Sequence, residues 1–82
     1  MPMSPADAIE LFRELLVELG SEEIAAQLNA EMQVKDLDMD SLELLEFLML
    51  VDERSGVEIS TDDAVYDARI GDLADIVSRK AA

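Results

Sequence analysis

Residues 37–46 of this 82-residue chain, LDMDSLELLE, decide its fold class. Asp40 is followed three positions later by Glu43 and then by a run of helix-forming residues. This spacing is a helix-capping pattern, and it predicts that a helix begins at or beside Ser41. The first backbone amides of a helix have no carbonyl partner within the helix and lie at the positive end of its dipole. A phosphate carried by the Ser41 hydroxyl would therefore be stabilised at this position.

The predicted helix runs from Asp40 to about Arg54 and has two different faces. A projection at about 100° per residue separates an apolar arc from an acidic side. The arc is predicted to lie in the core and consists of Leu44, Leu45, Phe47, Leu48 and Val51. The opposite side consists of Glu43, Glu46, Glu53 and Arg54, while Asp52 projects towards the arc.

Apolar side chains lie among the carboxylates of this helix, which favours a docking surface for proteins. The charges would attract a basic partner, and the apolar groups would supply contact area. The predicted docking residues are Leu42, Glu43, Glu46, Met49, Leu50 and Glu53.

A helix is also predicted at the start of the chain. Ser4 as N-cap, Pro5 at the first helical position and Gly20 after the last turn give its bounds. Its inward residues recur at helical spacing and are predicted to be Ile9, Phe12, Leu15, Leu16 and Leu19. Residues 21–29 are compatible with a short helix or with a loop.

The second half of the chain continues with short elements. Ser55 and Gly56 end the long helix, and residues 57–59 predict an extended step that buries Val57 and Ile59. A brief helix is expected near residues 62–66, and a last helix from Ile70 or Gly71 to Arg79. The predicted caps of the brief helix are Ser60 or Thr61 with Asp62 and Asp63. Because no alternating strand pattern occurs, we expect residues 1–82 to form a single all-α domain.

The composition excludes several classes of function. Twenty acidic residues against six basic ones give a formal net charge of −14, which disfavours binding to nucleic acid or to anionic membranes. The absence of cysteine and histidine removes disulfides, thiolate nucleophiles, the usual zinc ligands and the commonest general base. The chain is therefore poorly equipped to be an enzyme. No apolar run could span a bilayer and no secretion signal is recognised, so we expect a cytoplasmic monomer.

An EF-hand calcium site is the alternative role for the alternating aspartates that begin at Asp36. The sixth position of such a loop would be Ser41, where glycine is needed, and the twelfth would be Phe47, where a bidentate glutamate is needed. The spacing therefore predicts no metal site.

The combination of these features resembles the acyl carrier protein family. The resemblance rests on the triplet Asp40-Ser41-Leu42, the acidic helix after it, Val57-Glu58-Ile59, the sequence IGDL at residues 70–73 and the total length, and it extends from about Leu37 to Val77. It implies a four-helix bundle with three major helices and one short helix. It also implies that Ser41, between Asp40 and Leu42, carries a 4′-phosphopantetheine arm derived from coenzyme A.

The resemblance implies a carrier rather than an enzyme. The arm would hold acyl groups as thioesters for enzymes of fatty acid, polyketide or related lipid biosynthesis. The helix carboxylates would meet Arg and Lys on a phosphopantetheinyl transferase and on acyl-loading and synthase enzymes.

Three departures from the family pattern indicate a divergent member. Asp38 stands where glycine is usual, and Ser60 stands where a proline often occurs. Ser55 replaces an aromatic residue, so we expect Phe47 or Tyr66 to fill that part of the core. Two alternatives remain open: a peptidyl or aminoacyl carrier protein of a nonribosomal peptide pathway, and an unmodified acidic protein-interaction module.

Overall fold

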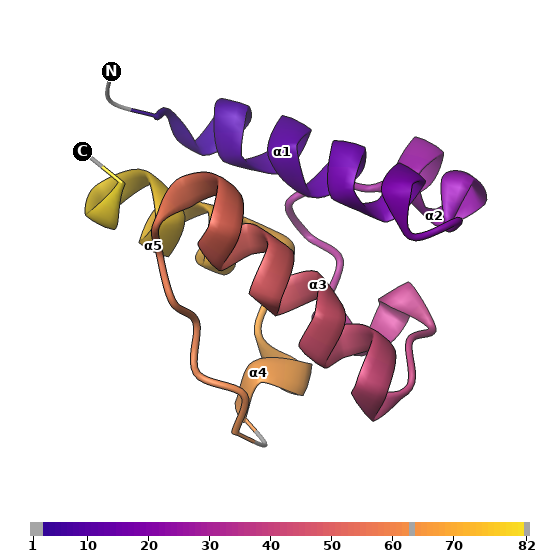
Figure 1. Ribbon diagram of the computed structural model, residues 1–82. Coiled ribbons are helices and arrows are strands. Elements are labelled where there is room, and N and C mark those ends of the chain that lie inside the picture. The colour runs from indigo at the N-terminus through magenta and orange to yellow at the C-terminus, as the bar shows by residue number, and fades with distance from the viewer. Residues whose placement is uncertain (1–2, 63, 82) are drawn as a thin grey trace.

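The computed structural model of the chain describes residues 3–62 and 64–81, and these form a bundle of helices (Figure 1). Within these ranges the β-type pairing is limited to an isolated antiparallel bridge between Gln33 and Arg69. The all-α prediction is therefore confirmed. The α-helices are α1 (Pro5–Glu18), α2 (Glu22–Gln27), α3 (Ser41–Ser55), α4 (Ala64–Asp67) and α5 (Ile70–Lys80), with a 3₁₀ helix at Val34–Leu37.

Three of these helices are long and two are short, so the described chain has one more short helix than the predicted four-helix arrangement. The additional helix is α2, which occupies the segment that the sequence left open between helix and loop. Ala25 and Leu28 are buried there, and this burial supports a helix of only six residues.

The long helices begin and end as predicted. The Ser4 hydroxyl accepts a hydrogen bond from the Asp7 amide at 3.1 Å, and the Asp7 carboxylate accepts one from the Ser4 amide at 3.2 Å. Gly20, after α1, and Gly56, after α3, have φ angles of 84° and 75°, in the left-handed region. Glycine enters this region without a steric penalty, so both helices end there.

The core is mainly aliphatic and lies between α1, α3 and α5, the three long helices in Figure 1. Phe12 of α1 and Phe47 of α3 are its two buried aromatic residues in the described chain, and their rings pack edge to face at a centroid distance of 5.7 Å. Phe47 thus fills the core, whereas Tyr66 is only half-buried. The predicted inward residues Val57 and Ile59 are buried as well.

The prediction that Leu45 belongs to the core is wrong. Its side chain is 43% exposed, while the neighbouring Leu44 is only 3% exposed. One residue advances about 100° around a helix. The buried arc of α3 includes Leu44, Phe47, Leu48 and Val51, and Leu45 lies beyond the edge of this arc.

The brief helix α4 lies beside the 3₁₀ helix. It begins at Ala64, and the Asp62 carboxylate accepts a hydrogen bond from the Ala64 amide at 3.1 Å, so the predicted capping role of Asp62 is confirmed. The corresponding prediction for Asp63 lies outside the described residues. The Gln33 side chain donates to the Asp67 carbonyl at 2.9 Å, and Lys35 pairs with the Asp67 carboxylate at 3.3 Å.

Backbone hydrogen bonds also connect residues 30–34 with residues 68–71. They are Val34 N to Ala68 O at 2.9 Å, Ile70 N to Met32 O at 2.7 Å, and Gly71 N to Ala30 O at 2.8 Å. Because α4 has only four residues, these long-range bonds determine its position. Its position beside the N-terminal half of α3 matters for the site (Figure 1).

Candidate functional site

Ser41 is the first residue of α3, and its side chain is exposed. The helix N-cap is Asp40, whose Oδ1 accepts a hydrogen bond from the Glu43 amide at 2.8 Å. The Asp40 carbonyl accepts another from the Leu44 amide at 3.0 Å. The predicted helix start is confirmed, and it directs the Ser41 hydroxyl into solvent beside the first amides of the helix.

The turn before Ser41 has a left-handed residue at Asp38. Its φ and ψ angles are 56° and 39°, and among the described residues it alone has a positive φ without being a glycine. Aspartate is one of the few residues with a side chain that adopts this conformation at modest cost. The departure from glycine at this position therefore leaves the turn intact.

Tyr66 of α4 lies close to Ser41. Its hydroxyl donates to the Ser41 Oγ with an oxygen to oxygen distance of 3.4 Å. The two residues are 25 positions apart, so no local sequence pattern could have paired them. The sequence alone predicts Tyr66 only as a candidate for the core.

Carboxylates surround Ser41 on its own segment. Asp38, Asp40 and Glu43 are all exposed. Lys35, the basic residue nearest to Ser41 in the sequence, is paired with Asp67. A basic partner protein would meet an anionic surface here.

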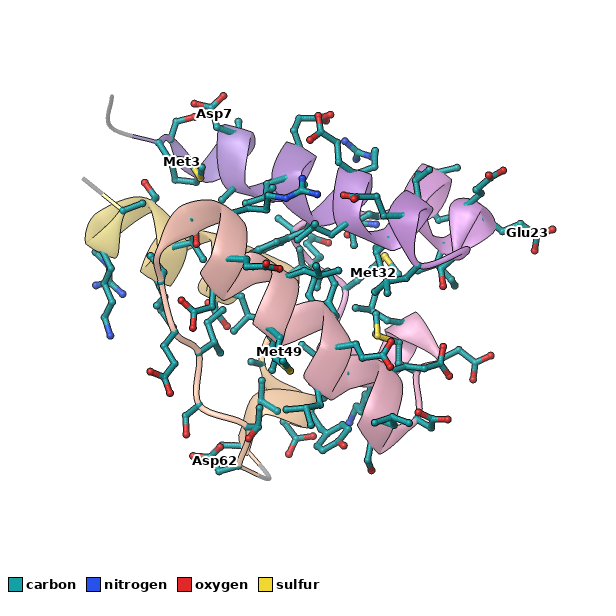
Figure 2. The ribbon with its side chains drawn as sticks, in the orientation of Figure 1. Met3, Asp7, Glu23, Met32, Met49 and Asp62 are labelled. Atoms are coloured by element: carbon teal, nitrogen blue, oxygen red, sulfur yellow. The ribbon has the colours of Figure 1, made fainter. Side chains whose placement is uncertain are left out.

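The predicted docking residues share the outer face of α3. Leu42 and Met49 are 65% and 61% exposed, and the exposed Leu45 lies between them at helical spacing. These three residues form an apolar stripe. The sequence predicts only Leu42 and Met49 as part of it, because the helical projection puts Leu45 in the core. Figure 2 shows Met49 on α3, and Asp62 near the start of α4.

Beside the stripe, Glu43, Glu46 and Glu53 are exposed and Leu50 is half-buried. Leu50 lines a shallow groove of about 230 Å³ together with Glu46, Met49, Glu53 and Leu19, the residue that follows α1. Leu19 packs against the core, as predicted, and its partial exposure adds the residue after α1 to this surface. Asp52 is also exposed, rather than turned towards the core. We call the six predicted residues together with Leu19 and Leu45 the docking surface.

Two further observations concern the described chain as a whole. In residues 3–62 and 64–81, the aspartate and glutamate side chains form no group of three or more suited to holding a metal ion. Over the same ranges, each helix is too short or too polar to cross a membrane.

Comparison with known proteins identifies relatives along most of the chain. It is 37% identical over 73 residues to an acyl carrier protein of Solidesulfovibrio magneticus, and this match covers 87% of the chain and 91% of the relative. It is 47% identical over 47 residues to the acyl carrier protein of Nitratidesulfovibrio vulgaris strain DP4 and to that of the Hildenborough strain. These matches cover 57% of the chain and span 62% of the length of each relative. No family model matches the chain, and no solved structure matches it.

Proposed function

The chain belongs to the acyl carrier protein family, and from this premise we propose that it holds acyl groups as thioesters on a 4′-phosphopantetheine arm at Ser41. The observation that carries the proposal is the exposed Ser41 at the first position of α3. In this role the protein is a carrier, and the catalytic groups belong to the enzymes that it serves.

The residues around Ser41 fit a phosphodiester. The amides of Ser41 and Leu42 are at the positions of a helix that have no intrahelical carbonyl partner, so they can donate to an anionic oxygen. The Asp40 carboxylate accepts a hydrogen bond from the Glu43 amide and thereby stabilises the first turn of α3. When bound, phosphopantetheine supplies the thiol that this cysteine-free chain lacks.

The docking surface supports a role in protein recognition. Exposed carboxylates at Glu43, Glu46 and Glu53 would attract basic patches, while Leu42, Leu45 and Met49 would supply apolar contact. The partners that match this chemistry are a phosphopantetheinyl transferase, which takes the arm from coenzyme A, and acyl-loading and synthase enzymes. We assign these partners to fatty acid, polyketide or related lipid biosynthesis in the cytoplasm.

Thiol titration tests this proposal cleanly, because the chain contains no cysteine. The protein is incubated with coenzyme A, magnesium and a broad-specificity phosphopantetheinyl transferase, then separated from small thiols and titrated. We expect one thiol per chain for the unmutated protein, one for the control Ser60→Ala, and none for Ser41→Ala. A folded protein that gains no thiol with several transferases would instead support the unmodified interaction module.

The docking surface is tested by the same reaction. Glu46→Gln should raise the KM for the carrier while the protein remains a substrate, and rising salt should reduce the difference from the unmutated protein. Glu58→Gln, which removes an exposed carboxylate after the end of α3, is the matched control. Equal KM values for both variants would contradict the assigned surface.

A further inference from the structure

Among the described residues, Tyr66 alone from outside the segment of Ser41 has a side chain that hydrogen-bonds to Ser41. The distance of 3.4 Å between the two oxygens is longer than the range of about 2.5 to 3.0 Å of a good hydrogen bond between hydroxyls. The phenol is therefore too far away to bond strongly to Ser41 Oγ itself. It is close enough to meet a group attached to that oxygen.

Hydrogen bonds of the two residues after Tyr66 fix the position of the phenol. Asp67, the next residue, accepts hydrogen bonds from the side chains of Gln33 and Lys35. The backbone of Ala68 accepts from the Val34 amide at 2.9 Å. The ring of Tyr66 is half-buried, so its hydroxyl is presented to Ser41 at a low cost in conformational freedom.

The negative charges near Ser41 explain why a hydrogen bond from the Tyr66 hydroxyl would matter there. A phosphodiester at Ser41 is an anion beside the exposed carboxylates of Asp38, Asp40 and Glu43. Lys35 forms an ion pair with Asp67. A neutral hydroxyl can donate to an anionic oxygen, and hydrogen bonds to anions are shorter and stronger than those between neutral groups.

We propose that Tyr66 is a positioning residue whose hydroxyl donates a hydrogen bond to the phosphodiester of the arm on Ser41, an inference that rests on the proposed function. The bond connects α4 to the start of α3 once the arm is attached. It also limits the directions in which the base of the arm can leave the protein surface.

The first test is ³¹P NMR of the modified protein. Tyr66→Phe retains the ring and removes the hydroxyl, and Thr61→Val removes an exposed hydroxyl from the loop before α4 as the matched control. We expect the phosphodiester resonance to move in Tyr66→Phe and to stay at its original position in Thr61→Val. An unmoved resonance in folded, modified Tyr66→Phe would overturn the inference and leave the carrier function intact.

The second test is a thermal cycle that compares modified with unmodified protein. In the unmutated chain, modification should raise Tm by about 3 °C more than it does in Tyr66→Phe, the shift expected for one surface hydrogen bond to an anion in a domain of this size. A purely structural role for the phenol would lower both Tm values of the variant equally, and this result would count against the inference.

A third measurement needs no variant and remains valid if Tyr66→Phe fails to fold. Tyr66 is the only tyrosine and the chain has no tryptophan, so its emission reports this site alone. Donation by the phenol to an anion should reduce this emission when the arm is attached. Unchanged emission in protein that has demonstrably gained one thiol would overturn the inference, whereas protein that gains no thiol would refute the proposed function instead.

Discussion

Replacing Arg13 by methionine should destabilise the fold more than any other single loss of a basic side chain. Arg13 leaves α1 and crosses to the end of α2, where its Nε donates to the Ala25 carbonyl and its Nη2 to the Leu28 carbonyl, each at 3.0 Å. It also pairs with Glu10. Carbonyls at the end of a helix lack the full set of intrahelical amides. Within the described residues, the Ala25 carbonyl otherwise accepts only a long bond from the Leu28 amide at 3.3 Å, and Leu28 follows the last residue of α2.

The magnitude follows from the two carbonyl contacts. A hydrogen bond from a charged donor contributes about 1.5 to 3 kcal/mol when it is well buried. The Arg13 side chain is 32% exposed, so we reduce the contribution to about 1 kcal/mol per bond and expect the two bonds together to contribute about 2 kcal/mol. For a domain of this size, that loss lowers Tm by about 10 °C.

The assay is urea and thermal unfolding followed by helical circular dichroism, with Arg54→Met as the matched control. Both substitutions remove one positive charge, but Arg54 makes a surface ion pair with Glu18 in which the two side chains are 45% and 46% exposed. Such a pair contributes about 0.5 kcal/mol or less, and salt screens it. Arg13→Lys keeps the charge but lacks the planar fork, so it should recover only a minor part of the loss.

The result that would refute this reasoning is equality between the two methionine variants. If Arg13→Met and Arg54→Met differed by less than about 0.5 kcal/mol, the carbonyl contacts would carry no more free energy than an exposed ion pair. The link between α1 and α2 would then depend on the burial of Ala25 and Leu28 alone.

Three other outcomes are expected from the same unfolding assay. Asp38→Gly should raise the free energy of unfolding by about 0.5 to 1 kcal/mol, because a left-handed φ strains a residue with a Cβ, and a lower urea midpoint would contradict this. Leu44→Ala should lower the free energy of unfolding by about 2 to 5 kcal/mol, because Leu44 is a core residue. Leu45→Ala should lower it by less than about 1 kcal/mol, because Leu45 is already half exposed. Similar losses for the two variants would indicate that Leu45 belongs to the core. Added sodium chloride should raise Tm, since the net charge of −14 repels itself in the compact state, and a Tm that does not change with salt would oppose this explanation.

The parts of the fold that sequence predicted well are the parts set by near neighbours in the chain. Ser4 and Asp7 form their capping pair within a single turn, and Asp40 reaches the Glu43 amide in the same way. Gly20 and Gly56 end their helices through their own backbone angles. These interactions span at most four residues, so the sequence pattern contains both partners.

The parts that sequence did not predict depend on contacts between distant segments. A helical projection orders the faces of α3 but does not show where the neighbouring helices stop covering it, so Leu45 was assigned to the core. The position of Arg13 in its helix gives no sign that it donates to carbonyls 12 and 15 residues away. Tyr66 lies close to Ser41 because backbone hydrogen bonds between distant segments position α4 beside the 3₁₀ helix. Hydrophobic periodicity does not predict such bonds.

The central claim is that Ser41 carries the arm, and intact mass spectrometry tests it most directly. The unmutated protein and Ser41→Ala are each incubated with coenzyme A, magnesium and a phosphopantetheinyl transferase, and folding of both is verified by circular dichroism. The account predicts that the unmutated protein gains the mass of one phosphopantetheine and that Ser41→Ala gains none. An equal gain in both proteins would contradict the assignment of Ser41, and no gain in either with several transferases would contradict the carrier function itself.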